Sequence, residues 1–243
     1  MRLPLWVEMT GRRVLVVGGG RVGTRRALMF ARAGAEVKVA ALEFTGELVE
    51  AERRGLVQLV KLDALRESGK LRDLVRWADI VVIATDNPQV NSEVWTLARE
   101  ARKWVNDATD AAKTEIVVPY VGEVFGGRIK LAVTSEGRSG VAARHARDEA
   151  VKFLEQQKWL KTMLDVMEAL KKALKKLVPE AKRRIPAYFA AEKALLNNLK
   201  LLYSGDTSKA LELAVKEAAK TVGVDESRLL SAARASLGAS TEN

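Results

Sequence analysis

The chain has 243 residues, of which 48% are hydrophobic and 30% charged, and this balance is that of a globular protein and excludes an intrinsically disordered chain. It contains no cysteine, which excludes disulfides, thiolate metal sites and a cysteine nucleophile. No stretch approaches the roughly 18 apolar residues that span a bilayer, and the first residues lack the pattern of a signal peptide, so we expect a cytoplasmic protein with no membrane segment.

The charge balance is basic. Lys and Arg number 41 against 31 Asp and Glu, which gives a formal net charge of +10. Two interpretations are open: solvated Lys and Arg on helix surfaces, or an anionic partner such as nucleic acid, a membrane surface or a substrate with many carboxylates. The basic segments 171–176 and 182–184 lack interleaved aromatic residues. We therefore expect no nucleic-acid partner.

The first half of the chain alternates apolar runs with helical patterns. Strands are predicted over residues 14–17, 36–42, 57–62 and 80–85. Helices are predicted over residues 21–34, 71–78 and 91–103. Strands that are continuously apolar and separated by helices indicate a parallel sheet buried on both faces. The sequence therefore predicts an α/β fold with a Rossmann-like parallel sheet, and we assign this domain to residues 1–113.

The pattern changes in the second half. Strand-like runs at 115–121 and 128–134 meet at Gly126-Gly127, which predicts a β-hairpin or two strands that cross between subunits. Beyond Ser139 the pattern is helical, with one long helix predicted over 141–177, interruptions at Pro179 and Pro186, and further helices ending at residues 205, 223 and 238. We expect a small β-containing region over 114–147 and an all-helical domain over 148–243.

A glycine-rich loop follows the first predicted strand. Gly18, Gly20 and Gly23 form a G-x-G-x-x-G spacing between that strand and the next helix, which is the context of a dinucleotide-binding loop. The first glycine permits the tight turn, the second lets the backbone approach a pyrophosphate, and the third lets helix and strand pack closely. The sequence therefore predicts that this loop, with Arg21 and Val22, binds a dinucleotide; a glycine turn of purely structural function is the alternative.

The end of the second strand bears on which dinucleotide binds. An acidic residue there holds the adenosine ribose of NAD, and Glu43 is the nearest candidate. Arg21, Arg25 and Arg26 lie in or just after the loop, where they either favour a 2′-phosphate or are simply exposed. We expect NAD rather than NADP.

Small polar residues follow the fourth predicted strand. Thr85, Asp86 and Asn87 lie at its C-terminal end, where ligands bind in open α/β sheets. We expect these three residues to contact the cofactor ribose. An ordinary helix-entry turn is the alternative.

Several segments, taken in order, resemble the precorrin-2 dehydrogenase family, the type found at the N-terminus of siroheme synthases. The resemblance covers residues 1–150, whereas the helical remainder matches in position and character only. The segments that carry it are LPLWVEMTGRRVLVVGGGRVGTRRA, ADIVVIATDNPQVN, WVNDATDA, EIVVPY and LAVTSEGRSGVAARHARDEAV.

The resemblance implies NAD-dependent oxidation of precorrin-2 to sirohydrochlorin by a homodimer, with the central region as the dimerisation region. Precorrin-2 is a small tetrapyrrole with eight carboxylates, which would explain the basic charge through steering and neutralisation of the substrate. Some family members also insert ferrous iron. The alternatives are thus a bifunctional enzyme with ferrochelatase activity, or a module that senses NAD(H) without turnover.

The resemblance also implies a catalytic aspartate that this sequence does not place at the family's position. In the family, that Asp follows the motif's Asn by about three residues and precedes a Pro by ten. Counting from Asn106 to Pro119 puts Thr109 at this position, with Asp107 and Asp110 on either side. We predict Asp110 as the proton acceptor, with Asp107 second; the alternative is that both are turn residues. Asn106 is expected at the substrate.

Two further expectations concern the substrate and metals. Ser139 matches a family serine at a helix entry, where it either caps the helix or contacts the substrate. With no cysteine and a single histidine, His145, the sequence predicts no resident metal site.

Overall fold

The computed structural model describes residues 2–238. The chain separates into two compact units, each of which is described by itself. The first, called the sheet unit below, comprises the chain up to Pro119 together with Thr134–Gly140. The second, the helical unit, comprises Tyr120–Val133 and the chain from Val141 onward. The three-part division at residues 113 and 147 stays a prediction.

The sheet unit contains a five-stranded parallel sheet, which confirms the predicted fold class. The order is β3-β2-β1-β4-β5. Its strands are β1 (Arg13–Val17), β2 (Glu36–Ala41), β3 (Gln58–Lys61), β4 (Ile80–Ile83) and β5 (Trp104–Asp107). The sequence did not predict β5, because it has four residues and ends in Asn-Asp. The pairing of Val105 with Val81 on β4 makes it a strand.

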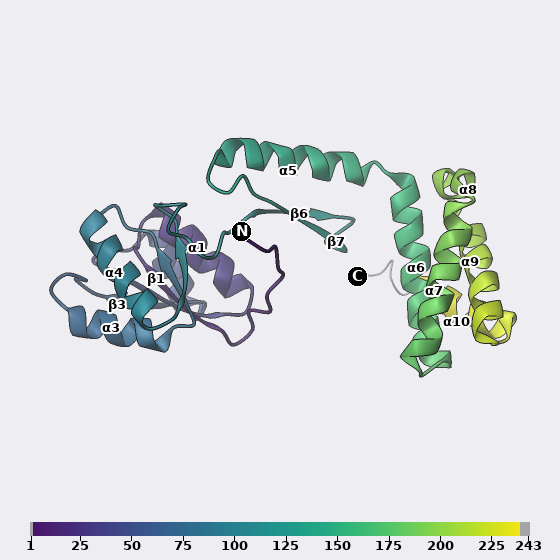
Figure 1. Cartoon of the computed structure of the whole chain (residues 1–243), viewed down its shortest axis with the longest axis horizontal. Helices are drawn as coiled ribbons and strands as arrows, with labels where there is room; N and C mark the ends of the chain where they lie inside the picture. The colour runs from purple at the N-terminus through teal and green to yellow at the C-terminus, as the bar shows by residue number, and fades with distance from the viewer. Residues whose placement is uncertain (1, 239–243) are drawn as a thin grey trace. The chain divides into compact units, whose positions relative to one another are not determined.

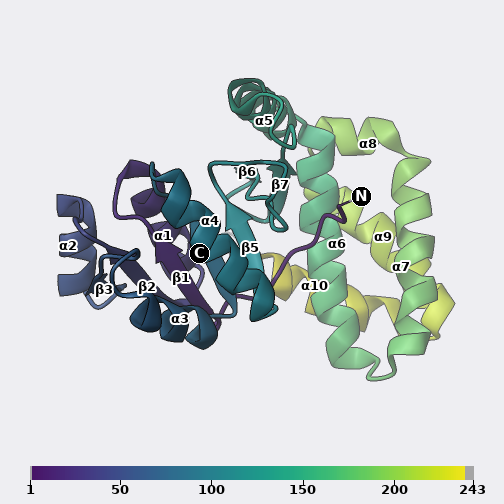
Figure 2. The same cartoon turned by 60° about the vertical axis from the view of Figure 1, so that its left-hand side comes forward.

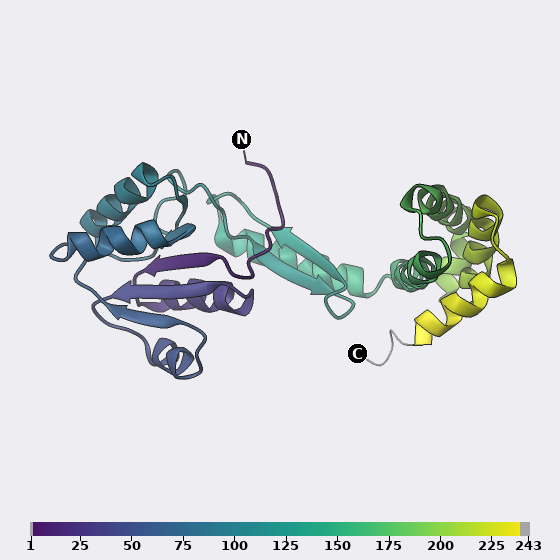
Figure 3. The same ribbon diagram turned by 90° about the horizontal axis from the view of Figure 1, so that it is seen from below.

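Helices cover both faces of this sheet (Figures 1 and 3). Alternation along β1 sends Leu15 and Val17 to one apolar core, and Val14 and Val16 to the other. The helices are α1 (Arg21–Arg32), α2 (Gly46–Arg53), α3 (Ser68–Trp77) and α4 (Pro88–Glu100). Residues of α3 and α4 belong to the first core, and residues of α1 and α2 to the second. Only α2 was not predicted, since it is eight residues long.

The strand order reverses next to β1. The chain passes from β1 to β2 on one side, and β4 pairs with the other side of β1. The loop after β1 and the turn after β4 therefore diverge at the C-terminal edge of the sheet, which leaves a crevice between them. This crevice is where the predicted glycine loop and the polar residues after β4 meet.

The helical unit begins with a β-hairpin, as predicted. Strands β6 (Tyr120–Val124) and β7 (Ile129–Val133) pair antiparallel, and Gly126 and Gly127 in the connecting loop have positive φ. Strand β7 lies within the predicted run 128–134, whereas β6 overlaps the predicted run 115–121 only at residues 120 and 121. The earlier residues form no strand, because Glu115 and Ile116 donate their N–H groups to the Val105 carbonyl and Pro119 has no N–H to donate. Helix α5 (Gly140–Glu155) lies along the hairpin in Figures 1 and 3, and the guanidinium of Arg147 donates to the Val121 carbonyl at 2.6 Å.

Five further helices form a bundle with its own apolar core (Figure 2). They are α6 (Lys158–Leu177), α7 (Ala181–Leu196), α8 (Leu199–Ser204), α9 (Thr207–Val222) and α10 (Glu226–Gly238). The largest side chains that this core buries include Leu170, Leu174, Leu195, Leu211 and Leu229. No described helix is long and apolar enough to cross a membrane.

Two predictions about these helices are wrong. The helix predicted over 141–177 is two helices, because the chain leaves helical geometry at Gln157, where φ and ψ are −81° and 87°. Pro186 was expected to interrupt a helix but lies inside α7. A proline near a helix start removes one backbone hydrogen bond, and here Ala187, Ala191 and Leu195 bury the helix against the bundle and offset that loss.

Candidate active site

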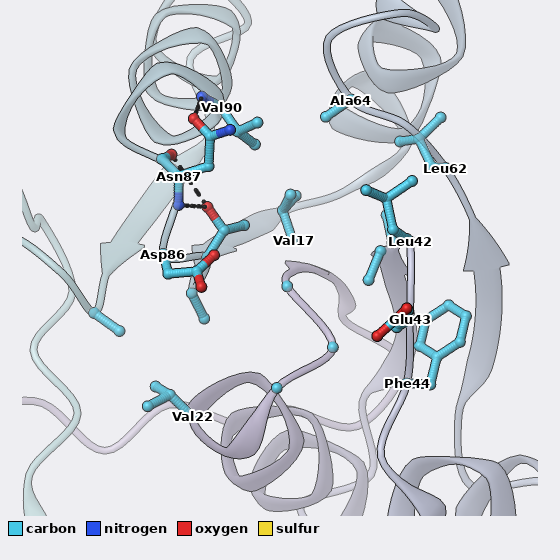
Figure 4. Close-up of a pocket in the computed structure, with 18 of the residues that line it drawn as sticks. Val17, Val22, Leu42, Glu43, Phe44, Leu62, Ala64, Asp86, Asn87 and Val90 are labelled. Carbon is cyan, nitrogen blue, oxygen red and sulfur yellow. Dashed lines mark hydrogen bonds between the residues drawn. The ribbon is translucent and has the colours of Figure 1, made fainter.

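A cavity of about 1040 Å³ occupies the crevice at the C-terminal edge of the sheet (Figure 4). Residues at or just after the ends of all five strands line it, together with the loop Gly18–Val22 and the N-terminal part of α4. This volume lies at the upper end of the roughly 300–1000 Å³ found for small-molecule sites. The cavity is therefore large enough for an extended ligand such as a dinucleotide.

The three glycines of the loop have different reasons to be glycine. Gly18 has φ +120°, and a Cβ there would collide with the carbonyl oxygen of Ala84. A Cβ on Gly23 would collide with the carbonyl of Gly18. A Cβ on Gly20, however, would meet nothing within 4 Å, although Gly20 lines the cavity. The fold itself requires Gly18 and Gly23, whereas Gly20 keeps space open for a ligand.

The loop presents the start of α1 to this space. Gly20 is the N-cap and supplies no side-chain cap, so the N–H groups of the first turn are free to bind an anion. Thr24 fixes the loop: its hydroxyl donates to the Gly20 carbonyl at 2.9 Å and lies 2.8 Å from the hydroxyl of Thr45. Arg21 and Val22 also line the cavity. The arrangement suits a pyrophosphate.

The β2 and β3 side of the cavity combines apolar side chains with one carboxylate. Leu42, Leu62 and Ala64 lie together, and Glu43 lies beside Phe44 (Figure 4). An apolar slot next to a carboxylate suits an adenine ring and a ribose whose hydroxyls donate hydrogen bonds. Glu43 lies two residues after the end of β2, and its role at the ribose stays a prediction.

The β4 side contains the three predicted polar residues, whose side chains do different things. Asn87 caps α4, since its Oδ1 accepts from the N–H groups of Gln89 and Val90 at 2.9 and 3.2 Å. The Thr85 hydroxyl lies 2.5 Å from Asn91 Oδ1. Asp86 has no hydrogen-bond or ion-pair partner among the described residues, and it is exposed to the cavity. The helix-entry role is thus met by Asn87 and Thr85, and the carboxylate of Asp86 is left available.

A second cavity of about 440 Å³ adjoins the first. Three residues line both cavities: Thr85, Asp86 and Thr109. The remaining lining residues of the smaller cavity are Pro88, Asn91, Ser92, Trp95, Asp107, Asp110 and Lys113. Two neighbouring spaces with a common wall are what a reaction between a cofactor and a second substrate needs.

Both predicted catalytic aspartates line the smaller cavity, and both shape their own loop. Asp107 is 6% exposed, and its Oδ1 accepts from the Thr109 N–H at 2.8 Å, the Thr109 hydroxyl at 2.7 Å and the Asp110 N–H at 3.1 Å. Asp110 Oδ1 accepts from the Ala112 N–H at 2.9 Å, and its other oxygen lies 3.7 Å from Lys113 Nζ. These contacts are those of turn-forming aspartates.

The two predicted substrate residues line neither cavity. Asn106 is 3% exposed, and its side-chain amide donates to the Ile116 carbonyl at 2.7 Å. Ser139 lies in the segment that the sheet unit includes before α5, and its N–H donates to Ser135 Oγ at 2.9 Å. Their roles at a substrate stay predictions.

Sequence reasoning missed six residues of the smaller cavity, namely Pro88, Asn91, Ser92, Trp95, Thr109 and Lys113. Asn91 joins its wall, because its amide donates to the Thr85 carbonyl at 3.1 Å and lies 3.4 Å from the Thr109 hydroxyl. Trp95 and Lys113 also line this cavity. Asn91 and Trp95 lie one and two helical turns after Asn87, so the helical spacing of polar and aromatic residues was the signal that could have found them. Lys113 had no such signal.

The described residues contain no group of three or more His, Asp or Glu side chains placed to hold a metal ion. The residues of the larger cavity do fit NAD: an open glycine position faces the cavity at a helix N-terminus, the carboxylate of Glu43 lines the cavity after β2, and the volume is sufficient.

Comparisons with known proteins agree with this geometry. Residues 5–120 match the family model described as “Putative NAD(P)-binding”. The chain is 31% identical over 183 residues to the precorrin-2 dehydrogenase of Methanosarcina barkeri, which covers 75% of this chain and 79% of that protein. It is 32% identical over 152 residues to siroheme synthase 1 of Pectobacterium atrosepticum, covering 63% of this chain and 30% of that protein.

Among solved structures, the chain is similar to SirC, a precorrin-2 dehydrogenase. The TM-score is 0.65 at 21% sequence identity, over 88% of this chain and 99% of that one. At this identity, the likeness shows the fold.

Proposed function

The chain belongs to the precorrin-2 dehydrogenase family, and from this premise we propose that it oxidises precorrin-2 to sirohydrochlorin with NAD as the cofactor. The observation that carries the proposal is the pair of adjoining cavities in the sheet unit. One has the size and the glycine loop that a dinucleotide needs, and the other shares with it the wall formed by Thr85, Asp86 and Thr109.

The residues that would hold NAD follow from their positions in the larger cavity. We assign the pyrophosphate to the loop Gly18–Gly23, with Arg21 and Val22 at its entrance. We assign the adenosine ribose to Glu43 and the nicotinamide half to the end of β4, at Thr85, Asp86 and Asn87. Bound NAD⁺ supplies the hydride acceptor of the reaction.

The protein has three tasks in this chemistry: to orient the substrate beside the cofactor, to keep their reacting atoms adjacent, and to accept a proton. Asp110 and Asp107, predicted from the sequence as acceptors, line the smaller cavity together with Lys113. The side chain of Lys113 is 55% exposed, and its ammonium group can pair with a carboxylate of the substrate. Asn106 supports this loop through its bond to the Ile116 carbonyl.

Anaerobic turnover tests the function directly. Purified protein, precorrin-2 and NAD⁺ are mixed, and the absorbance of NADH and of sirohydrochlorin is followed with time. We expect the two products to form in a one-to-one ratio. Protein that binds NAD but leaves precorrin-2 unchanged would be a sensing module instead of an enzyme.

Iron insertion is a separate question that the same preparation answers. Sirohydrochlorin and ferrous iron are incubated with and without the protein, and siroheme formation is compared between the two. An acceleration by the protein would make it bifunctional, and equal rates would leave it a dehydrogenase alone.

We also propose a homodimer, formed through the predicted central region 114–147, which contains the hairpin and the start of α5, together with the rest of α5. A two-stranded ribbon is marginal by itself, and the hairpin pairs with no further strand of the described chain. Helix α5 has sixteen residues and buries Ala143 only, while Val141 and Phe153 are 63% and 62% exposed. A second copy that covers this surface would remove the exposed apolar area.

Light scattering after size-exclusion chromatography tests the dimer. We expect twice the chain mass of 26.7 kDa for the wild type and a shift toward the monomer for Val121→Asp on β6. Val49→Asp, at a comparably exposed position on α2, is the matched control. A monomeric wild type would overturn the dimer.

The cytoplasmic location also stays a proposal, which cell fractionation tests.

A further inference from the structure

Three residues form the wall common to the two cavities, and only one of them is an acid. Thr85 and Thr109 carry neutral hydroxyl groups, which are too weakly basic to hold an additional proton. Asp86 carries a carboxylate, which can accept one. We propose that Asp86 is the proton acceptor of the oxidation. This inference rests on the proposed function and assigns to Asp86 a role beyond cofactor contact.

The position of Asp86 follows from the reaction. The substrate carbon that gives up the hydride must lie against the nicotinamide half of the cofactor site, and the proton leaves from the same part of the substrate. A base must therefore lie within hydrogen-bond reach of the boundary between the two sites. Asp107 and Asp110 line the smaller cavity only, whereas Asp86 lines both.

The hydrogen bonds of the three aspartates point the same way. Asp107 Oδ1 accepts three hydrogen bonds that close its loop, and a proton on that oxygen would displace them. Asp110 accepts from the Ala112 N–H and lies near Lys113. The carboxylate of Asp86 has no partner in the described part of the chain, so it can accept a proton without breaking a bond of the fold.

The backbone around Asp86 is fixed although its carboxylate is free. On one side the Thr85 hydroxyl and carbonyl bond to the side chain of Asn91, and on the other Asn87 caps α4. Figure 4 shows the carboxylate projecting from the β4–α4 turn toward the glycine loop. A rigid turn that carries an unpaired carboxylate is the geometry of a prepositioned base.

The step balances without a further reactant. Precorrin-2 loses two electrons and two hydrogens: one hydrogen leaves with its electron pair as a hydride to NAD⁺, and the other leaves as a proton to the Asp86 carboxylate. One new double bond remains in the macrocycle. The proton then passes from Asp86 to solvent, which reaches this exposed side chain.

The test compares Asp86→Asn with Asp107→Asn and Asp110→Asn, which remove one carboxylate each and keep its shape. Asp73→Asn on α3, which lines neither cavity and has a side chain 79% exposed, is the matched control. Each protein is assayed for kcat with precorrin-2, for KM of both substrates, for the NAD dissociation constant by calorimetry and for its unfolding temperature.

We expect Asp86→Asn to lower kcat by roughly 10²–10⁴-fold while the NAD dissociation constant and the unfolding temperature stay near those of wild type. Asp73→Asn should match the wild type in every measurement.

Other outcomes separate the failure of this inference from failure of the function. If Asp86→Asn weakens NAD binding with kcat unchanged, Asp86 contacts the cofactor only, and its assignment as the proton acceptor is overturned. If Asp110→Asn or Asp107→Asn loses turnover while Asp86→Asn keeps it, the base is in the other loop. A wild type that binds NAD without turnover overturns the proposed function itself.

A smaller variant provides an independent readout. Asp86→Gly removes the carboxylate and leaves room beside the turn, and formate added to the assay should restore part of its kcat in proportion to formate concentration. Formate should have no effect on the wild type. Absence of rescue in a folded Asp86→Gly protein that binds NAD would contradict proton transfer at this position.

Discussion

At the larger cavity, some residues are required by the fold, whereas others are open to a ligand. Gly18 and Gly20 belong to one motif, yet a Cβ on the first would strike the Ala84 carbonyl and a Cβ on the second would meet open space. The same contrast applies to Asn87 and Asp86, of which the first caps a helix and the second bonds to no described residue. Substitutions at Gly18 and Asn87 should therefore affect stability, whereas substitutions at Gly20 and Asp86 should affect ligand binding or turnover.

The glycine pair gives the first prediction. Gly20→Val should weaken NAD binding at least tenfold, because its side chain would fill the space that the pyrophosphate needs, and should change the free energy of unfolding little. Gly18→Ala should instead destabilise the protein by roughly 1–3 kcal/mol, since it strains a positive φ and collides with backbone. Calorimetric NAD titration and urea unfolding measure the two effects. Equal losses of stability would refute the distinction.

The second prediction concerns Glu43. Its carboxylate lines the larger cavity, and at the ribose position that we propose for it, it can accept hydrogen bonds from the hydroxyls of NAD and repel the extra phosphate of NADP. Glu43→Gln should weaken NAD binding by about tenfold, which corresponds to ~1.4 kcal/mol, and narrow the preference over NADP. Dissociation constants for both dinucleotides test this, with Glu47→Gln on α2 as control. If Glu43→Gln leaves the preference for NAD over NADP unchanged, other residues determine which dinucleotide binds.

At the scale of elements, the sheet depends on how strands begin as well as on how they end. Asp79 precedes β4 and binds the start of β1: its carboxylate accepts from the Arg13 N–H at 3.0 Å and from the Arg13 guanidinium at 3.3 Å. The Arg13 backbone N–H, and then the guanidinium, hold the pKa of Asp79 below its ordinary value. This pair links two adjacent strands at the edge opposite to the cavities.

The sign of its pH dependence follows from that lowered pKa. The stabilisation is complete above the unfolded-state pKa of about 3.9 and is lost as the pH falls through the lower pKa of the folded protein. Asp79→Asn should therefore reduce the free energy of unfolding by about 1 kcal/mol at pH 7, with a smaller reduction toward pH 3. Urea unfolding of both proteins across this range measures it. A difference that grows on acidification would contradict the assignment.

At the scale of the whole molecule, two separate apolar cores mean that stability is divided between two units. The larger cavity is lined by the sheet unit alone, while the bundle of α6–α10 has its own core. Ligand binding stabilises only the part of the protein that binds it. The two units should therefore respond differently to NAD.

Calorimetry with and without NAD tests this. At a hundredfold excess of NAD over its dissociation constant, the sheet unit should gain ~2.7 kcal/mol, which raises its unfolding temperature by roughly 10 °C. The transition of the helical unit should stay in place. Leu174→Ala in the bundle core should do the reverse. It should reduce the free energy of unfolding of the helical unit by roughly 2–5 kcal/mol without changing the affinity for NAD. A single transition that NAD moves as a whole would show that the units unfold together.

Local and periodic features of this protein could be predicted from the order of its residues. The four apolar strands, the glycine loop after β1 and the Gly126-Gly127 hairpin were all predicted, because alternation, helical spacing and positive-φ glycines leave a direct trace in the order of residues. The resemblance of the segments over 1–150 to a known family added the activity, which the comparisons support.

Features that depend on contacts between distant segments could not be predicted in this way and are known from the folded chain. Strand β5 exists through its pairing with β4, and α7 continues through Pro186 because the bundle buries its other face. The wall shared by the two cavities joins residues from the turn after β4 and from the loop after β5, more than twenty positions apart. Which aspartate is free and which is bound to its own loop is a matter of hydrogen-bond partners, and partners are set by the folded chain.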